Sequence, residues 1–152
     1  ALLLSRYSGA RDVVFGAALS GRPADLPGVQ SMVGPCVNNL PVRVTVSPDA
    51  ALAGWLVQLH EHQGVLSRYQ HCSLTEIQRW TGIPWRFRIF DSLVVVQNYQ
   101  VDGGAFHLGA KVNVRELVGP YRTNYPLTLM VLPGHEIVIR AIYHRFPKAE
   151  LL

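Results

Sequence analysis

The spacing of apolar and polar residues predicts the order of elements in the first part of the chain. Residues 2–7 are interpreted as a helix because Gly9 follows them, and glycine is common just past a helix terminus. Residues 12–19 form a short apolar run that is consistent with a buried strand. Residues 20–34 are rich in glycine and proline and predict a loop with demanding backbone geometry.

A strand and a long helix are predicted next. Residues 41–46 alternate valine with Arg43 and Thr45, the period-two pattern of a strand with one polar face. We expect the helix to start at Ser47 and Pro48, because serine caps free amide groups and proline fits the first helical position. Apolar residues at helical spacing then predict an amphipathic helix: Leu52, Trp55, Leu56, Leu59, Leu66 and Tyr69.

The pattern continues with a second helix and a buried strand. Ser73 and Glu76 have capping-box spacing, so a short helix is expected over residues 74–80, with Gly82 after it. Residues 90–99 are dominated by leucine and valine and predict a strand buried on both faces.

A hairpin completes the predicted elements. Residues 127–132 and 136–143 are expected to pair around a Pro133–Gly134 turn, because proline and glycine suit the two central turn positions. Since strands and helices interleave, the predicted fold class is α/β, with a mixed sheet packed by helices. A chain of 152 residues is long enough for one such domain or lobe.

Composition and charge indicate a partner protein and exclude nucleic acid. Apolar residues make up 49% of the chain and charged residues only 16%, against a usual charged share of about 25%, so some apolar surface is expected to face a partner. The net charge is +4 but the basic residues form no run, which argues against nucleic-acid binding. A mild positive field would help to recruit an acidic partner.

The cysteines and the termini bear on location. Cys36 and Cys72 have no CxxC spacing and no secretory signal precedes them, so we expect reduced thiols in a cytoplasmic protein. The opening ALLL is too short for a membrane span, and no membrane contact is expected. We expect both ends to be truncations within a longer polypeptide, with residues 1–152 forming a single lobe.

Several kinds of site are excluded by spacing. His60 and His62 point about 200° apart on a helix and cannot share an ion, so no metal site is expected. Cys36 has no predicted base or cation beside it, and the glycines lack phosphate-binding order. The three tryptophans are most simply aromatics of the core or of a lobe interface: Trp55, Trp80 and Trp85.

Four phrases carry a resemblance to a known family. They are DVVFGAALSGRP (12–23), VGPCVNNLPVRV (33–44), IFDSLVVVQNY (89–99) and NYPLTLMV (124–131). In this order they resemble the carboxyl-terminal half of a condensation domain of nonribosomal peptide synthetases, a family related in fold to chloramphenicol acetyltransferase. The family's catalytic HHxxxDG motif lies in the amino-terminal half, and nothing in this sequence matches it.

The resemblance implies one of two lobes that form a V around a reaction chamber. It implies amide-bond formation between a carrier-bound thioester and a carrier-bound amine, in a tunnel partly walled by this lobe. It also implies that the lobe is not catalytic alone and binds no cofactor directly, because partner carrier proteins bring the phosphopantetheine arm. The implied partners are the amino-terminal lobe, peptidyl or acyl carrier proteins and adjacent synthetase domains.

Polar residues near the family phrases are the candidate tunnel residues. Asn38 and Asn39 stand just before the predicted strand, where an amide can orient a carbonyl and an amine without titrating; alternatively, Asn38 pins the loop to nearby backbone. Ser92, Gln97 and Asn98 are further candidates on or beside the 90–99 strand, with Gln97 on the opposite face from the other two. Satisfaction of buried polar groups is the alternative explanation.

Two arginines are fixed points of the family pattern, Arg22 in SGRP and Arg43 in LPVR. Arginine suits a buried pair with a carboxylate because its donors form a planar fork. Our hypothesis is that Arg22 pairs across the lobe interface with the aspartate of the absent motif. A local brace within its own loop is the alternative.

Two other functions stay open at this point. One is a noncatalytic lobe that docks a carrier protein or another domain. The other is an independent acyltransferase that uses one of the chain's six histidines.

Overall fold

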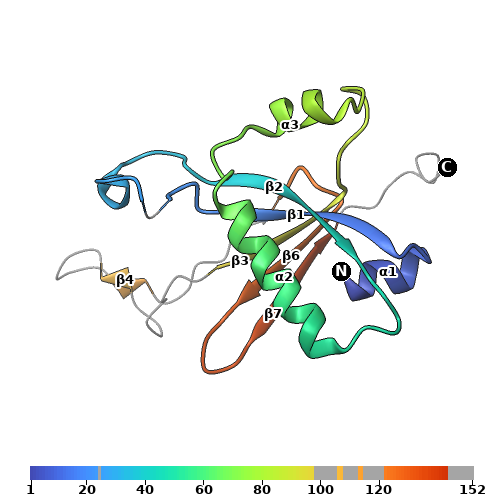
Figure 1. Ribbon diagram of the computed structural model, residues 1–152. Helices are drawn as coiled ribbons and strands as arrows, with labels where there is room; N and C mark the ends of the chain where they lie inside the picture. Colours follow the sequence, from blue (N-terminus) through green and yellow to red (C-terminus); the bar gives the residue numbers. More distant parts are fainter. Residues whose placement is uncertain (24, 98–105, 108–112, 115–121, 144–152) are drawn as a thin grey trace. The chain divides into compact units, whose positions relative to one another are not determined.

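The computed structural model describes residues 1–23, 25–97, 106–107, 113–114 and 122–143 (Figure 1). Their elements, in chain order, are α1 (Leu2–Ser8), β1 (Asp12–Leu19), the 3-10 turn η1 (Val29–Ser31), β2 (Asn38–Thr45), α2 (Leu52–Ser67), α3 (Leu74–Thr81), β3 (Ser92–Val96), β4 (Phe106–His107), β5 (Asn113–Val114), β6 (Leu127–Leu132) and β7 (Val138–Tyr143). The main sheet is mixed, with strand order β2-β1-β3-β6-β7, and β4 pairs with β5. The predicted α/β class is confirmed.

The chain divides into two compact units, Ala1–Val94 and Val95–Leu152. In the first unit, β1 and β2 form an antiparallel hairpin whose register runs from Asp12 opposite Thr45 to Leu19 opposite Asn38. Strand β3 joins β1 in parallel, with Gly16 beside Leu93.

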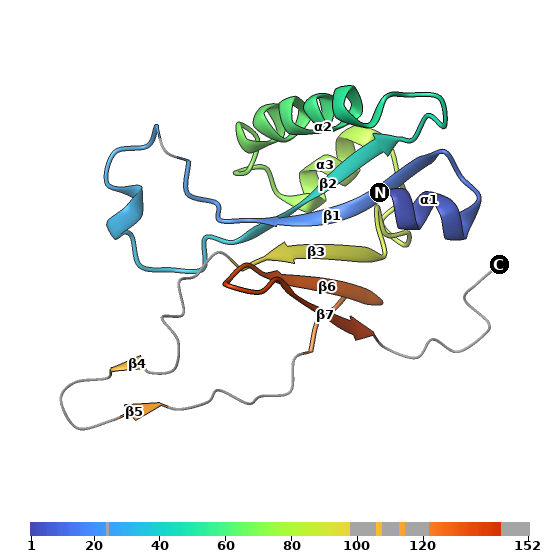
Figure 2. The same cartoon turned by 90° about the horizontal axis from the view of Figure 1, so that it is seen from below.

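The core of the first unit lies between the β1–β2 hairpin and α2. Val13, Val42 and Val44 are buried together, and Trp55 and Leu59 of α2 are among the side chains that pack against them. Figures 1 and 2 show α2 lying along one side of the hairpin. Burial of these side chains is the main reason why the helix and the hairpin hold together.

The opposite face of β1 is closed by an aromatic ring. Phe90 is buried, and a side chain at Gly16 would overlap its ring, so the absence of a Cβ at this position lets the ring lie on the strand. Phe90 itself precedes β3, which runs only over Ser92–Val96 and ends with Val96 exposed. The prediction had the strand begin at residue 90 and bury both faces. The strand instead begins at Ser92 and ends at Val96, which is exposed.

The long helix also differs from its prediction. It begins at Leu52 after Ala51, which provides no side-chain cap, and not at Ser47 and Pro48. Leu52 and Leu56 are exposed, because apolar residues occupy more of the helix circumference than the stripe that packs on the core. The chain's excess of apolar residues thus reaches the surface here.

The second helix matches its prediction in detail. The Ser73 hydroxyl accepts from the Glu76 backbone N–H at 3.2 Å, and the Glu76 carboxylate accepts from the Ser73 backbone N–H at 3.1 Å. Gly82 follows in the left-handed conformation. The hydrogen bond from the Ser73 hydroxyl, followed by that from its backbone, holds the pKa of Glu76 below its ordinary value.

The second unit contains the predicted hairpin. β6 and β7 pair from Leu127 opposite Tyr143 to Leu132 opposite Val138, so residues 133–137 connect them, a longer connection than the expected two-residue turn. The Gln97 backbone N–H donates to the Val131 carbonyl at 2.9 Å. Among the described residues, no helix is long and apolar enough to cross a bilayer.

Candidate functional site

The candidate site is centred on the end of the β1–β2 hairpin, where the phrases SGRP and GPCVNN approach each other. Gly21 has a φ of 64°, and a side chain there would overlap the Cys36 carbonyl. The two arms of the 20–37 loop therefore touch at this point, and only glycine combines the left-handed backbone with such a close approach. The contact fixes the position of Arg22 on one arm and of Asn38 on the other.

Arg22 braces the loop from within. Its Nη1 donates to the carbonyl of Val29, and Val29 is buried at the start of η1. Its backbone N–H also approaches the Ser20 hydroxyl at 3.3 Å. A guanidinium has five N–H donors, and this contact uses only one, so a carboxylate pairing of Arg22 is chemically compatible with the brace.

Asn38 is the first residue of β2, and the expectation that it precedes the strand is corrected. Its Nδ2 donates to the carbonyls of Gln70 at 3.0 Å and Cys72 at 2.6 Å, while its Oδ1 accepts from the Asn39 backbone N–H at 3.0 Å. Because Gln70 and Cys72 are buried in the turn after α2, the amide satisfies carbonyls that water reaches poorly. The amide thus ties β2 to that turn.

Asn39 is separated from Asn38 by the pleat of the strand. It pairs with Ala18, whereas Asn38 pairs with Leu19, so the two amides start from opposite faces of the hairpin. Both residues are half-buried. Asn38 and Asn39 are adjacent in the sequence, but their side chains therefore belong to opposite faces of the hairpin.

Arg43 pairs with a carboxylate, as expected for arginine, but the pair lies at the surface and is not buried. Its Nε and Nη2 donate to the Asp12 carboxylate, with the Nη2–Oδ2 distance at 2.6 Å. The Arg43 side chain is 75% exposed, so solvent screens the pair. The hydrogen bonds that Arg43 donates to the carboxylate lower the pKa of Asp12 and raise the pKa of Arg43.

Ser92 lies away from the asparagines along the sheet. The parallel register places Gly16 beside Leu93, so Ser92 lies beside Phe15 in the middle of β1. Asn38 pairs with Leu19, four residues further along β1, which is about 13 Å. Gln97 is half-buried just after β3, at the other end of that strand, and Asn98 lies outside the described residues.

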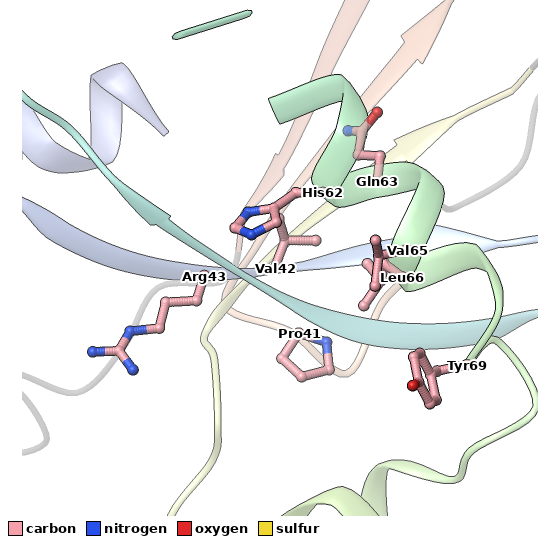
Figure 3. Close-up of a pocket in the computed structure, with 8 residues that line it drawn as sticks. All are labelled: Pro41, Val42, Arg43, His62, Gln63, Val65, Leu66 and Tyr69. Carbon is pink, nitrogen blue, oxygen red and sulfur yellow. The ribbon is translucent and has the colours of Figure 1, made fainter. Parts of the chain in front are cut away.

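A groove runs between β2 and α2 (Figure 3). It encloses about 220 Å³ and is lined by Pro41, Val42, Arg43, His62, Gln63, Val65, Leu66 and Tyr69. A second hollow of about 250 Å³ shares Arg43 and His62 with it. In Figure 3 the Arg43 guanidinium points away from α2, so the groove is bordered mainly by apolar side chains.

Sequence reasoning did not place His62 in this groove. Its spacing from Trp55, Leu59 and Leu66 puts it on the stripe of α2 that faces the core, and this spacing was the available signal. Within the part of the chain that the structure describes, no three His, Cys, Asp or Glu side chains gather as a metal site would require. Both described cysteines are free thiols, Cys36 half-buried and Cys72 buried.

Comparison with known proteins identifies the family. The family described as Condensation domain matches residues 1–148. The chain is 42% identical over 142 residues to a linear gramicidin synthase of Brevibacillus parabrevis, covering 92% of this chain and 3% of that protein. It is 39% identical over 138 residues to a chondramide synthase of Chondromyces crocatus, covering 90% of this chain and 4% of that protein.

Solved structures agree on the fold. The first condensation domain of the CDA synthetase superposes with a TM-score of 0.67 at 22% identity, covering 91% of this chain and 31% of that one. The starter condensation domain of rhizomide synthetase superposes with a TM-score of 0.64 at 23% identity, covering 85% of this chain and 28% of that one. The chain therefore spans about a third of these solved relatives and a few per cent of the curated synthetases. Its fold, its family phrases and these matches together show that the chain belongs to the condensation domain family.

Proposed function

We propose that this chain is the carboxyl-terminal lobe of a nonribosomal peptide synthetase condensation domain and forms part of the wall of its substrate tunnel. One observation carries the proposal. The family match extends over residues 1–148, yet these residues contain no HHxxxDG motif and no two adjacent histidines. The lobe supplies walls and positioning groups, and the proton-handling histidine belongs to the amino-terminal lobe.

In the proposed reaction, the amine nitrogen of one carrier-bound residue attacks the thioester carbonyl of another. The new C–N bond forms, the C–S bond breaks, and the amine proton passes through the histidine of the other lobe. The released thiol stays on the arm of the donor carrier. The phosphopantetheine arms belong to the carrier proteins, so this lobe needs no cofactor of its own.

Asn39, Ser92, Gln97 and Asn98 are the proposed tunnel residues, with Gln97 lining a different surface from Asn98 because the two alternate in face along the predicted strand. Asn38 is proposed to act as a positioning residue, because both of its amide donors already bind backbone carbonyls. Its contribution would be to hold the Gly34–Asn39 arm at a fixed place relative to α2. Orientation of bound reactants is a large part of what such a tunnel contributes to rate.

Arg22 is proposed to order the catalytic loop of the other lobe through the aspartate of its HHxxxDG motif, while bracing its own loop at Val29. Replacing Arg22 by Ala in the complete domain is expected to reduce amide formation about 100-fold or more, a loss typical of misplaced catalytic groups. Arg22→Lys should keep the charge but lose the planar fork. Unchanged turnover in Arg22→Ala would remove the interlobe role.

The test of the function is complementation. The chain is assayed alone and together with an amino-terminal condensation lobe that carries HHxxxDG, using carrier-bound donor and acceptor substrates and mass spectrometry of the product. We expect amide product only when both lobes are present. Product from the chain alone would support an independent acyltransferase. Binding of carriers without product from the paired lobes would support a noncatalytic docking lobe.

A further inference from the structure

The end of α3 and the connection from it to β3 expose large aromatic side chains that the fold leaves outside its core. Trp80 is 68% exposed, Trp85 91% and Phe87 54%. The sequence left two places open for Trp80 and Trp85, the core or a lobe interface. The core is wrong for both, because both side chains are exposed. Exposed aromatic groups of this size usually mark a contact surface.

Arginines stand next to these aromatics in the sequence. Residues 79–88 contain Arg79, Arg86 and Arg88 and no aspartate or glutamate. The Arg86 guanidinium lies 4.9 Å from the centroid of the Phe87 ring, a cation–π arrangement. We call the set Arg79, Trp80, Trp85, Arg86, Phe87 and Arg88 the tryptophan–arginine patch.

The patch is held in place before any partner arrives. The Gln78 side-chain amide, on α3, donates to the carbonyls of Pro84 at 3.0 Å and Phe87 at 2.7 Å. The Phe87 backbone N–H closes a turn onto Pro84 at 2.9 Å. Because the loop is tied to its helix at two points, little conformational entropy remains to be lost on binding.

Composition and charge indicate the kind of partner. Tryptophan and arginine are the residue types that dominate binding energy at protein interfaces. The Arg88 guanidinium lies 3.8 Å from the Asp91 carboxylate, so Arg79 and Arg86 are the cations that favour an acidic surface. Glu76 and Asp91 stand on either side of the patch in the sequence, and their carboxylates disfavour a uniformly anionic plane such as a membrane.

From these observations we infer that the tryptophan–arginine patch docks the acidic surface of a carrier domain, with the Trp85 indole seated in an apolar recess of that domain. The choice of a carrier domain as the occupant rests on the proposed function. The contact is electrostatically steered and anchored by one aromatic side chain.

The test measures the dissociation constant of an excised, phosphopantetheine-bearing acidic carrier domain for the complete condensation domain. Arg79→Glu with Arg86→Glu, and separately Trp85→Ala, should each weaken binding about tenfold or more, as expected for residues of this kind. The matched control is Arg68→Glu with Arg11→Glu, which makes the same charge change at a helix end and in a loop elsewhere in the same unit. The control should shift binding less than about twofold. Thermal midpoints should be unchanged, because the replaced side chains are exposed.

Carrier binding within twofold of wild type in both patch variants would overturn the inference. So would loss of binding to vesicles of anionic phospholipid with carrier binding intact, because the occupant would then be lipid. Product assays keep this result separate from the proposed function. If the wild-type domain forms product and the patch variants bind the carrier as tightly as wild type, only the patch is rejected. If the wild-type domain forms no product but the patch variants bind the carrier more weakly than wild type, only the proposed function is rejected.

Discussion

Two loops of the first unit are each braced by a polar side chain, and they differ in the apolar side chains that they expose, which are aliphatic in the 20–37 loop and aromatic in the 82–88 loop. In the 20–37 loop, Arg22 donates to the Val29 carbonyl, and in the 82–88 loop, Gln78 donates to the carbonyls of Pro84 and Phe87. The first loop ends at Asn38, whose amide is engaged with buried backbone. The second presents Trp85 to solvent. Polar side chains here maintain the fold, whereas the exposed aromatic ones form the surface that we propose for a partner.

The largest expected difference in the free energy of unfolding is between replacements of two phenylalanines of the same segment, one buried and one exposed. Phe90 is 4% exposed and its ring lies on Gly16, whereas Phe87 is 54% exposed. Phe90→Ala should lower the free energy of unfolding by about 3–5 kcal/mol, because it leaves a cavity beside β1. Phe87→Ala should cost less than about 1 kcal/mol. Urea denaturation of the complete domain measures both, and equal losses would contradict the contrast.

A smaller effect is expected from the two bracing amides. Asn38→Ala leaves the carbonyls of Gln70 and Cys72 without their donor in a buried turn and should cost about 1–3 kcal/mol. Gln78→Ala removes bonds to carbonyls at the surface and should cost about 0.5–1.5 kcal/mol. If Asn38 only positions the loop, stability should fall together with activity. A loss of kcat with unchanged stability would instead assign the amide to the substrate.

These two loops also show what the sequence could and could not predict. A short apolar run placed β1, period-two alternation placed β2, and capping chemistry placed α3, because each signal depends on local residues alone. The engagement of Asn38 with residues 70–72 joins positions more than thirty residues apart, and no local pattern predicts it. The predicted start of α2 was wrong, because local cap preferences alone did not determine where the helix begins. Ser47 and Pro48 satisfy local cap preferences, but the helix begins at Leu52, four residues later.

Side-chain exposure was the least predictable property. Leu52 and Leu56 fit the helical spacing of a buried stripe, yet packing selects only part of that stripe for the core. His62 shows the converse, since a polar residue lies on the face toward β2 between two hollows. Among the candidate site residues, family phrases gave positions, and the structure added the contacts of Arg22, Asn38 and Arg43.

The smallest effect concerns the capping box of α3, which supports the outward-facing loop. Ser73→Ala should cost about 1 kcal/mol, a typical loss for an N-cap serine. Because the pKa of Glu76 is lowered in the folded state, its contribution is complete at neutral pH and is lost as the pH falls through the folded-state pKa. Glu76→Gln should therefore show a weaker loss of stability between neutral and acidic pH than wild type. An identical acid response in the two proteins would show that the capping box contributes nothing to it.

The measurement that tests the central claim most directly is the rate of amide formation by a complete domain in which all six histidines of this lobe are replaced by glutamine. These are His60, His62, His71, His107, His135 and His144. If the proton-handling imidazole belongs to the amino-terminal lobe, single-turnover product formation should stay within about tenfold of wild type, because no general base is lost. A loss of about 100-fold or more, with the thermal midpoint retained, would place the base in this chain and contradict the account.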